Sequence, residues 1–265
     1  ACCNYLKEVL NMATKKQGTV QEVYQLPSLG KPYGENYPSE VTIRSMTTFE
    51  EKMRLGNQGF MKTICNILDA VVTSPEEFNA SELTTFDFYF LMYKMRAVSY
   101  GPTYKVSVGC PHCGKQVVCR VNLDGLGVDY LEDETSEPFT IGPLPRSGDT
   151  LECRFLRTKD LIYNDKRSKE ILRTYPDYEG DPKYILEKTS RIKSVNGKAL
   201  NPGEAQMYVE QMPAMDSAYF DQAYSRLTDK VGMQTLCHEE CPECGEIIDF
   251  ELPFNSEFFR PTFDF

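Results

Sequence analysis

Two short motifs contain the residues of this chain that are best suited to chemistry. Both follow the pattern Cys-Pro-X-Cys-Gly, one at residues 110–114 and the other at residues 241–245. A tight turn of this kind places two thiolates on one side, and its glycine lets the backbone curl until the amides face the sulfurs. Two such turns supply four thiolates, which suit tetrahedral zinc with Zn–S distances of about 2.3 Å.

The sequence therefore predicts one structural zinc site with four ligands, Cys110, Cys113, Cys241 and Cys244. Soft sulfur ligands favour zinc or iron–sulfur centres over hard cations. Because all four positions would be protein sulfur, no position stays open for a reactive water. In a reducing cytoplasm, clustered cysteines more often bind metal than form disulfides. The two turns are far apart in the sequence, so we expect a zinc ribbon split by a long insertion.

A redox function is the alternative reading of the first motif. Cys-Pro-His-Cys is also typical of strongly oxidising disulfide exchangers, in which the first cysteine begins a helix. Here the flanking residues predict strands, and the second motif would have no role. Cys237 could replace a ligand, although we expect a free thiol. We expect His112 to face solvent and His238 to lie in a polar segment, and neither is a predicted ligand.

Other features give little reason to expect an enzyme. Cys65, Cys119 and Cys153 lie among apolar residues and are predicted to be core thiols. The chain has only two histidines and no nucleophile elbow, phosphate-binding loop or dinucleotide fingerprint. The acidic run at residues 132–134 is expected at the surface rather than as a catalytic carboxylate pair.

Composition favours protein partners over nucleic acid or membrane. The 265 residues carry a formal net charge of −10, which opposes binding to phosphate backbones. The basic runs at 166–169 and 191–193 are expected to be solvated helix faces or contacts with an acidic partner. No secretory signal is visible at residues 1–8. The most apolar window, residues 86–95, is interrupted by Asp87 and Lys94 and is too short to span a bilayer.

The elements around the motifs indicate an α+β fold. Alternating residues predict strands at about 104–108 and 117–121 around the first motif, and at 247–252 after the second. A helix over about 84–99 is apolar around most of its girth and should be deeply buried. Further strands are expected at 20–26, 41–46, 139–141 and 151–155. A helix should begin at Thr47, which has a capping hydroxyl followed by acids, and another should cover 60–71.

These elements define the expected organisation of the chain. Residues 1–18 form an N-terminal arm, either a docked helix or a tether for a partner. Residues 19–265 form a single α+β domain, in which 104–123 and 235–253 build the zinc ribbon. A largely helical insertion covers 159–232, with interruptions at 175–176, 180–182 and 201–203.

The last residues are predicted to be an ordered contact segment, because four phenylalanines fall within eight positions. These are Phe258, Phe259, Phe263 and Phe265. A terminus frays unless something ties it down, and exposing so much apolar surface is unfavourable. The rings either pack on their own domain or enter a neighbouring subunit, with Arg260 as a polar anchor at the rim.

Several blocks in this order resemble the baseplate hub and hub-assembly family of T-even-like contractile-tailed phages. They are residues 26–33, 41–52, 96–102, the two cysteine turns, 144–145 and 258–261. The resemblance implies a structural or assembly component of the central baseplate hub, within a multi-subunit assembly. Its implied partners are other hub or tail-tube initiator proteins, and its implied location is the virion tail, after assembly in the host cytoplasm. A zinc-ribbon nucleic-acid-binding protein and a thiol–disulfide oxidoreductase remain the alternatives.

Overall fold

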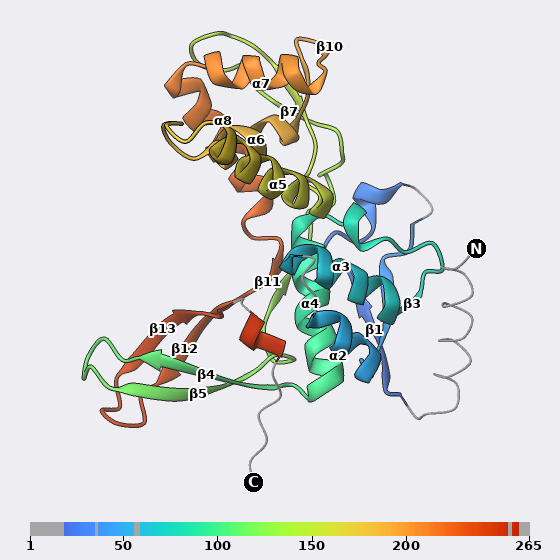
Figure 1. Cartoon of the computed structure of the whole chain (residues 1–265), viewed down its shortest axis with the longest axis vertical. Coiled ribbons are helices and arrows are strands. Elements are labelled where there is room, and N and C mark those ends of the chain that lie inside the picture. Colours follow the sequence, from blue (N-terminus) through green and yellow to red (C-terminus); the bar gives the residue numbers. More distant parts are fainter. Residues whose placement is uncertain (1–18, 35–36, 56–58, 254–255, 260–265) are drawn as a thin grey trace.

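The fold is that of a computed structural model, which describes residues 19–34, 37–55, 59–253 and 256–259. The predicted arm at 1–18, and Arg260, Phe263 and Phe265 at the other end, lie outside the described residues. The described chain mixes helices with several small antiparallel sheets, which confirms the α+β class. Figure 1 shows three parts: a central body, a helical lobe above it, and a pair of hairpins projecting to one side.

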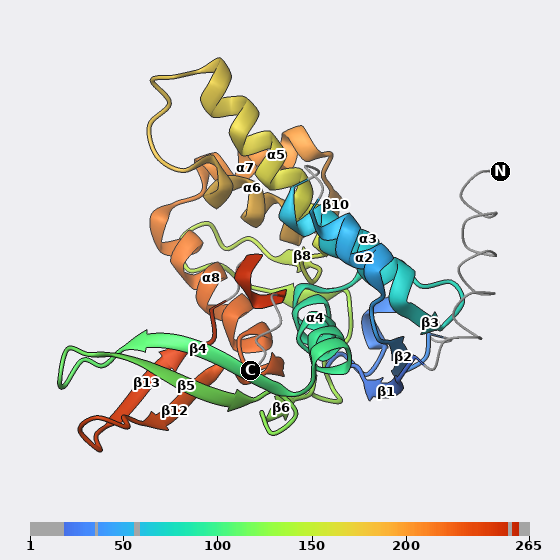
Figure 2. The same cartoon turned by 60° about the horizontal axis from the view of Figure 1, so that its bottom comes forward.

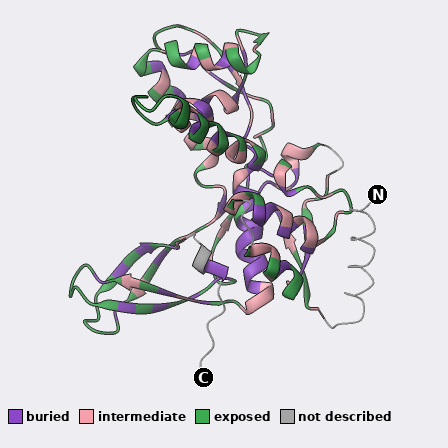
Figure 3. Ribbon diagram, in the orientation of Figure 1, coloured by how far each residue is buried: buried purple, intermediate pink, exposed green. Residues whose placement is uncertain are grey.

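The body is built around one buried helix. Helix α4 is apolar on nearly every side, and Figure 3 shows it as the most continuously buried helix of the body. Thr84 caps it by accepting a hydrogen bond from the Asp87 amide. Around α4 lie a three-stranded sheet and two further helices, and the sequence predicts each of these elements except the third strand. The elements are β1 (Gln21–Gln25), β2 (Glu40–Arg44), α2 (Thr48–Arg54), α3 (Phe60–Val71), β3 (Val72–Ser74) and α4 (Thr85–Tyr100), with 3-10 turns η1 (Lys31–Tyr33) and η2 (Ala80–Glu82).

The start of α2 shows how local sequence fixes an element. The Thr47 hydroxyl accepts from the Phe49 amide, and Glu50 accepts from the Thr47 amide, which completes a capping box. Glu50 also receives the Arg44 guanidinium at 2.8 Å, and both side chains are almost fully buried. Burial alone would raise the pKa of Glu50, but the hydrogen bonds from Arg44 and Thr47 outweigh it and hold that pKa below its ordinary value.

The lobe contains four helices and a four-stranded sheet in the order β10-β9-β8-β7. The expected helical interruptions fall at the ends of these helices. Within the stretch expected to be mainly helical, residues 192–199 form a hairpin that the sequence analysis did not anticipate. The elements are β7 (Phe139–Ile141), β8 (Leu151–Cys153), α5 (Thr158–Thr174), α6 (Pro182–Arg191), β9 (Ile192–Val195), β10 (Lys198–Ala199), α7 (Pro202–Gln211) and α8 (Ala214–Thr228).

The projecting part consists of two hairpins that form separate two-stranded sheets. The first pairs β4 (Thr103–Gly109) with β5 (Gln116–Asn122), and the second pairs β12 (Leu236–Glu240) with β13 (Ile247–Glu251). A short ladder between β6 (Val128–Asp129) and β11 (Gly232–Met233) lies at the base. Figures 1 and 2 show one hairpin lying over the other.

Alternate residues of both hairpins point into the space between them. On β5, Val117, Cys119 and Val121 are buried, while the residues between them are exposed. On the other hairpin, Cys237 and Phe250 are buried and directly paired across the strands. Since all of these belong to one hydrophobic cluster, the hairpins pack face to face, and each keeps one face toward solvent.

The described end of the chain returns to the body. The 3-10 turn η3 (Ser256–Phe259) places Phe258 and Phe259 in the core, with exposed fractions of 0% and 1%. For these two rings, packing on their own chain is the observed arrangement. No helix within the described ranges is long and apolar enough to cross a membrane.

Candidate metal centre

The four predicted ligands meet at the free tips of the two hairpins. The sulfurs of Cys110, Cys113, Cys241 and Cys244 all lie within 4.8 Å of one another. The two closest contacts join the hairpins: Cys110 Sγ is 3.8 Å from Cys244 Sγ, and Cys113 Sγ is 3.9 Å from Cys241 Sγ. The structure thus brings together cysteines separated by more than 120 positions.

The two turns are built by the same backbone hydrogen bonds. In the first, the Cys110 amide donates to the Lys115 carbonyl at 2.9 Å, and the Gly114 amide donates to the Cys110 carbonyl at 2.9 Å. The second turn repeats both bonds at equivalent positions, at 2.8 and 2.9 Å. Gly114 and Gly245 have φ values of 72° and 77°, which only glycine adopts at little cost. The repeated motif therefore encodes a repeated geometry.

The surroundings of the sulfurs favour thiolates on one side of the site. The Cys113 amide, with that of His112, lowers the pKa of Cys110 to about 6 against the opposing effect of burial. Cys110 and Cys241 are buried at the inner side of the cluster, whereas Cys113 and Cys244 are exposed. An ion could thus reach the sulfurs from solvent at the hairpin tips.

The spacing of the sulfurs fits a tetrahedral thiolate site. Four ligands about 2.3 Å from a central zinc would be about 3.8 Å from one another. The two sulfur–sulfur contacts between the hairpins, 3.8 and 3.9 Å, agree with this edge length. A disulfide would require about 2.05 Å, so the cysteines are free thiols in this arrangement. The donor set and its spacing are therefore compatible with a zinc or iron centre of four sulfurs.

Polar contacts next to the cluster also join the two hairpins. Lys115 forms an ion pair with Glu243 across the tips. The His112 ring nitrogen Nε2 lies 3.2 Å from the Ile247 carbonyl oxygen, so this exposed ring contacts the other hairpin rather than only solvent. His238 pairs with Asp249 at 2.7 Å on an outer face, away from the sulfurs.

The remaining cysteines lie elsewhere. Cys237 is buried on β12, with its sulfur 3.6 Å from the Thr235 carbonyl, and is not among the four clustered sulfurs. Cys65, Cys119 and Cys153 are core residues, as predicted. Strands flank both cysteine turns, so Cys110 does not begin a helix as the redox alternative requires.

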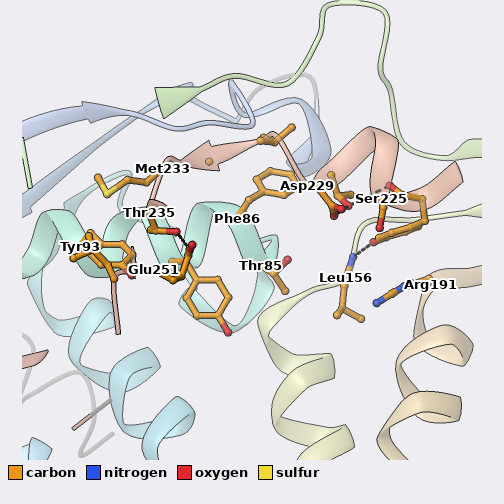
Figure 4. A pocket seen from close by; sticks show the side chains of 16 residues that line it. Thr85, Phe86, Tyr93, Leu156, Arg191, Ser225, Asp229, Met233, Thr235 and Glu251 are labelled. Atoms are coloured by element: carbon orange, nitrogen blue, oxygen red, sulfur yellow. Dashed lines mark hydrogen bonds between the residues drawn. The ribbon is translucent and has the colours of Figure 1, made fainter. Parts of the chain in front are cut away.

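A second concave feature lies where the lobe meets the body. This cleft of about 660 Å³ has Arg191 and Asp229 on one side and Tyr93 and Glu251 on the other (Figure 4). The lining residues that the structure describes include no histidine and no cysteine, the types that most often supply a general base or a reactive nucleophile. The cleft gives no reason to assign catalysis.

Sequence reasoning missed a buried cation that ties distant parts of the body together. Arg96 on α4 is 1% exposed, and its Nε donates to the Phe258 carbonyl at 3.0 Å. Another guanidinium nitrogen donates to the Gly101 carbonyl at 3.0 Å, and the group lies 4.8 Å from the Tyr104 ring centroid. Burial lowers the pKa of Arg96. The sequence signal was a lone arginine inside an apolar helix, which predicts a partner but not its identity.

Comparison with known proteins agrees with these observations. A protein-family model described as "T4 bacteriophage base plate protein" matches residues 19–260. No curated protein and no solved structure matches the chain. The matched range includes the body, the lobe and both cysteine turns, and the family favours a structural rather than an enzymatic role. This chain therefore belongs to the T4 bacteriophage base plate protein family.

Proposed function

We propose that this protein is a structural or assembly component of the central hub of a phage tail baseplate. Membership of the base plate family carries the proposal, because it places the chain in a multi-subunit tail assembly of the virion. The hub assignment rests on the sequence blocks at residues 26–33, 96–102 and 258–261. All three blocks contribute residues to the same core, in which Arg96 binds the Phe258 backbone.

The four-cysteine cluster would hold one structural zinc ion in this role. Cys110 and Cys113 would supply two thiolates, and Cys241 and Cys244 the other two. The ion would contribute charge compensation for the thiolates and a rigid link between the hairpins. Since the unfolded chain has no preformed site, metal binding would add directly to the folding free energy.

Apart from the apolar packing of their inner faces, the hairpins have few contacts that hold them together. They form no shared sheet, so backbone hydrogen bonds hold each hairpin but do not join the two. Across the tips, the polar contacts that the structure describes are the Lys115–Glu243 pair and the His112 contact, and both are exposed. Exposed ion pairs contribute about 0–1 kcal/mol. A closed thiolate site would therefore be the main restraint on the relative position of the tips. It would also fix the shape of any surface near the tips that a hub or tube-initiator protein binds.

Quantitative mass spectrometry of purified tails tests the proposed function. A structural subunit is expected in finished baseplates at a fixed ratio to the known hub proteins. An assembly factor is expected on baseplate intermediates and depleted from finished tails. Absence from both, with tails assembling normally when the gene is disrupted, would contradict the proposal.

A further inference from the structure

The two hairpins that hold the cysteine cluster carry opposite charge. Residues 103–122 contain three basic residues and no acidic one: Lys105, Lys115 and Arg120. Residues 236–251 contain six acidic residues and neither lysine nor arginine: Glu239, Glu240, Glu243, Glu246, Asp249 and Glu251. Because the hairpins pack face to face, their solvent faces point in opposite directions. The projecting part is thus a blade with one basic and one acidic face.

The basic face is the outer surface of β4 and β5. Arg120 is exposed and stands directly opposite Lys105 in the strand pairing. Both side chains place positive charge on this face. Val118 lies on the same face and is 60% exposed. The face therefore combines positive charge with an apolar side chain.

The acidic face is the outer surface of β12 and β13. Glu240 and Asp249 are exposed there, as are Leu236 and Ile247, each 54% exposed. Its layout mirrors the basic face, with carboxylates beside aliphatic side chains on a two-stranded sheet. The two faces are complementary in both charge and apolar content.

We propose that the blade is a head-to-tail contact between copies of this chain, in which the basic face of one copy binds the acidic face of the next. Each copy presents both halves of the contact on opposite sides of one rigid element. A single partner of uniform charge would satisfy only one face, whereas further copies of this chain satisfy both, with one copy on each side. Such a heterologous contact closes into a ring when the rotation between copies permits it.

The contact explains why the hairpins project from the body. The blade leaves the body almost free of other described elements (Figures 1 and 2), so neighbouring copies can reach both faces. The contact would also depend on the cysteine cluster, which holds the tips of the two hairpins together. If the tips separate, the angle between the two faces is lost, and with it the geometry that a closed ring needs.

Charge reversal on each face, followed by mixing, tests the proposal. Arg120→Glu lowers the net charge of residues 103–122 from +3 to +1, and Asp249→Lys changes that of residues 236–251 from −6 to −4. We expect the full-length, metal-loaded wild type to self-associate in sedimentation velocity at low salt. Each variant alone should associate at least about tenfold more weakly, since the altered position places like charges opposite each other and the net attraction between the faces falls. An equimolar mixture should recover most of the association, because the two altered faces complement each other.

Lys166→Glu on the exposed surface of α5 is the matched control, with the same change in charge as Arg120→Glu. It should associate like the wild type. Raising the salt concentration should weaken wild-type association, because exposed charges are screened. Recovery in the mixture cannot arise from misfolding of either variant.

Two results would overturn the proposal. One is a wild type that stays monomeric at low salt up to its solubility limit. If both variants were also excluded from baseplates in that case, a different protein would cover the faces. The other is a mixture that associates no better than its components. Neither result would show whether this protein is present in tails, so the proposed function is tested independently by the mass spectrometry of purified tails.

Discussion

Replacing Phe258 by alanine should destabilise the whole body. Its ring is fully buried and meets the rings of Tyr93, Tyr104 and Phe259 at centroid distances of 5.0, 5.0 and 5.1 Å. The Arg96 guanidinium lies 5.6 Å from the same ring. The substitution therefore opens a cavity among residues from three parts of the sequence.

The expected loss can be estimated from comparable core substitutions. Removing a buried phenylalanine side chain typically costs about 3–5 kcal/mol. The upper half of that range is expected here, because edge-to-face aromatic pairs add about 0.5–1.5 kcal/mol beyond area burial. For a protein of this size, about 4 kcal/mol corresponds to a fall in Tm of roughly 10–15 °C.

Chemical denaturation of purified Phe258→Ala, followed by circular dichroism, measures this loss. Tyr163→Ala is the control, because that ring is 60% exposed on α5 and its removal should change stability by about 0.5 kcal/mol or less. A change below about 1 kcal/mol in Phe258→Ala would refute the core assignment. If such a stable variant also failed to join baseplates, the ring would instead belong to an interface.

Three further substitutions probe the cysteine turns and the buried ion pair. Cys113→Ser should lower the free energy of unfolding by several kcal/mol, because it removes a metal ligand. Cys153→Ser should lower it by about 1–3 kcal/mol, because it buries a hydroxyl group. Equal losses in thermal melts would mean that the cysteine turns have no special role. Gly114→Ala should lower the free energy of unfolding by about 1–2 kcal/mol, because alanine is strained at the φ of 72° found there. The strain comes from the backbone alone, since an added Cβ would meet no atom within 4 Å. An unchanged denaturation midpoint would contradict this prediction. The pKa of Glu50 is lowered in the folded state, so its ionised pair with Arg44 stabilises the fold at pH values above the pKa of about 4.3 that a glutamate has in the unfolded chain. This stabilisation is lost progressively as the pH falls below that value. Glu50→Gln should therefore have a lower free energy of unfolding than wild type at pH 7, and this difference should narrow below about pH 4. A difference that stays constant with pH would argue against an ionised pair.

Local signals in the sequence were sufficient for three of the four strands that flank the cysteine turns, β12 being the exception. The Thr47 cap, the apolar girth of α4 and the alternation on β5 each depend on neighbours within a few residues, and each predicted element is present. The hairpin at 192–199 was missed, although Asn196-Gly197 is the dipeptide that type I′ turns favour. Both residues have positive φ, of 50° and 78°, as that turn requires.

Long-range pairings could not be predicted in the same way. Nothing in the residues around Arg96 indicates that its partners are the Phe258 and Gly101 carbonyls, since such contacts depend on the folded body. The stacking of the hairpins as two separate sheets is also a tertiary feature. The repeated cysteine motif was the exception, because four ligands for one ion must meet wherever they lie in the sequence.

Metal analysis of the purified full-length protein tests the central claim most directly. Inductively coupled plasma mass spectrometry, with protein quantified by amino-acid analysis, should find one zinc per chain. The zinc should be lost from Cys113→Ser and Cys241→Ser and retained in Cys237→Ser, since Cys237 lies outside the cluster of four sulfurs. A well-folded wild-type preparation that contains no metal, or that contains iron in place of zinc, would contradict the account.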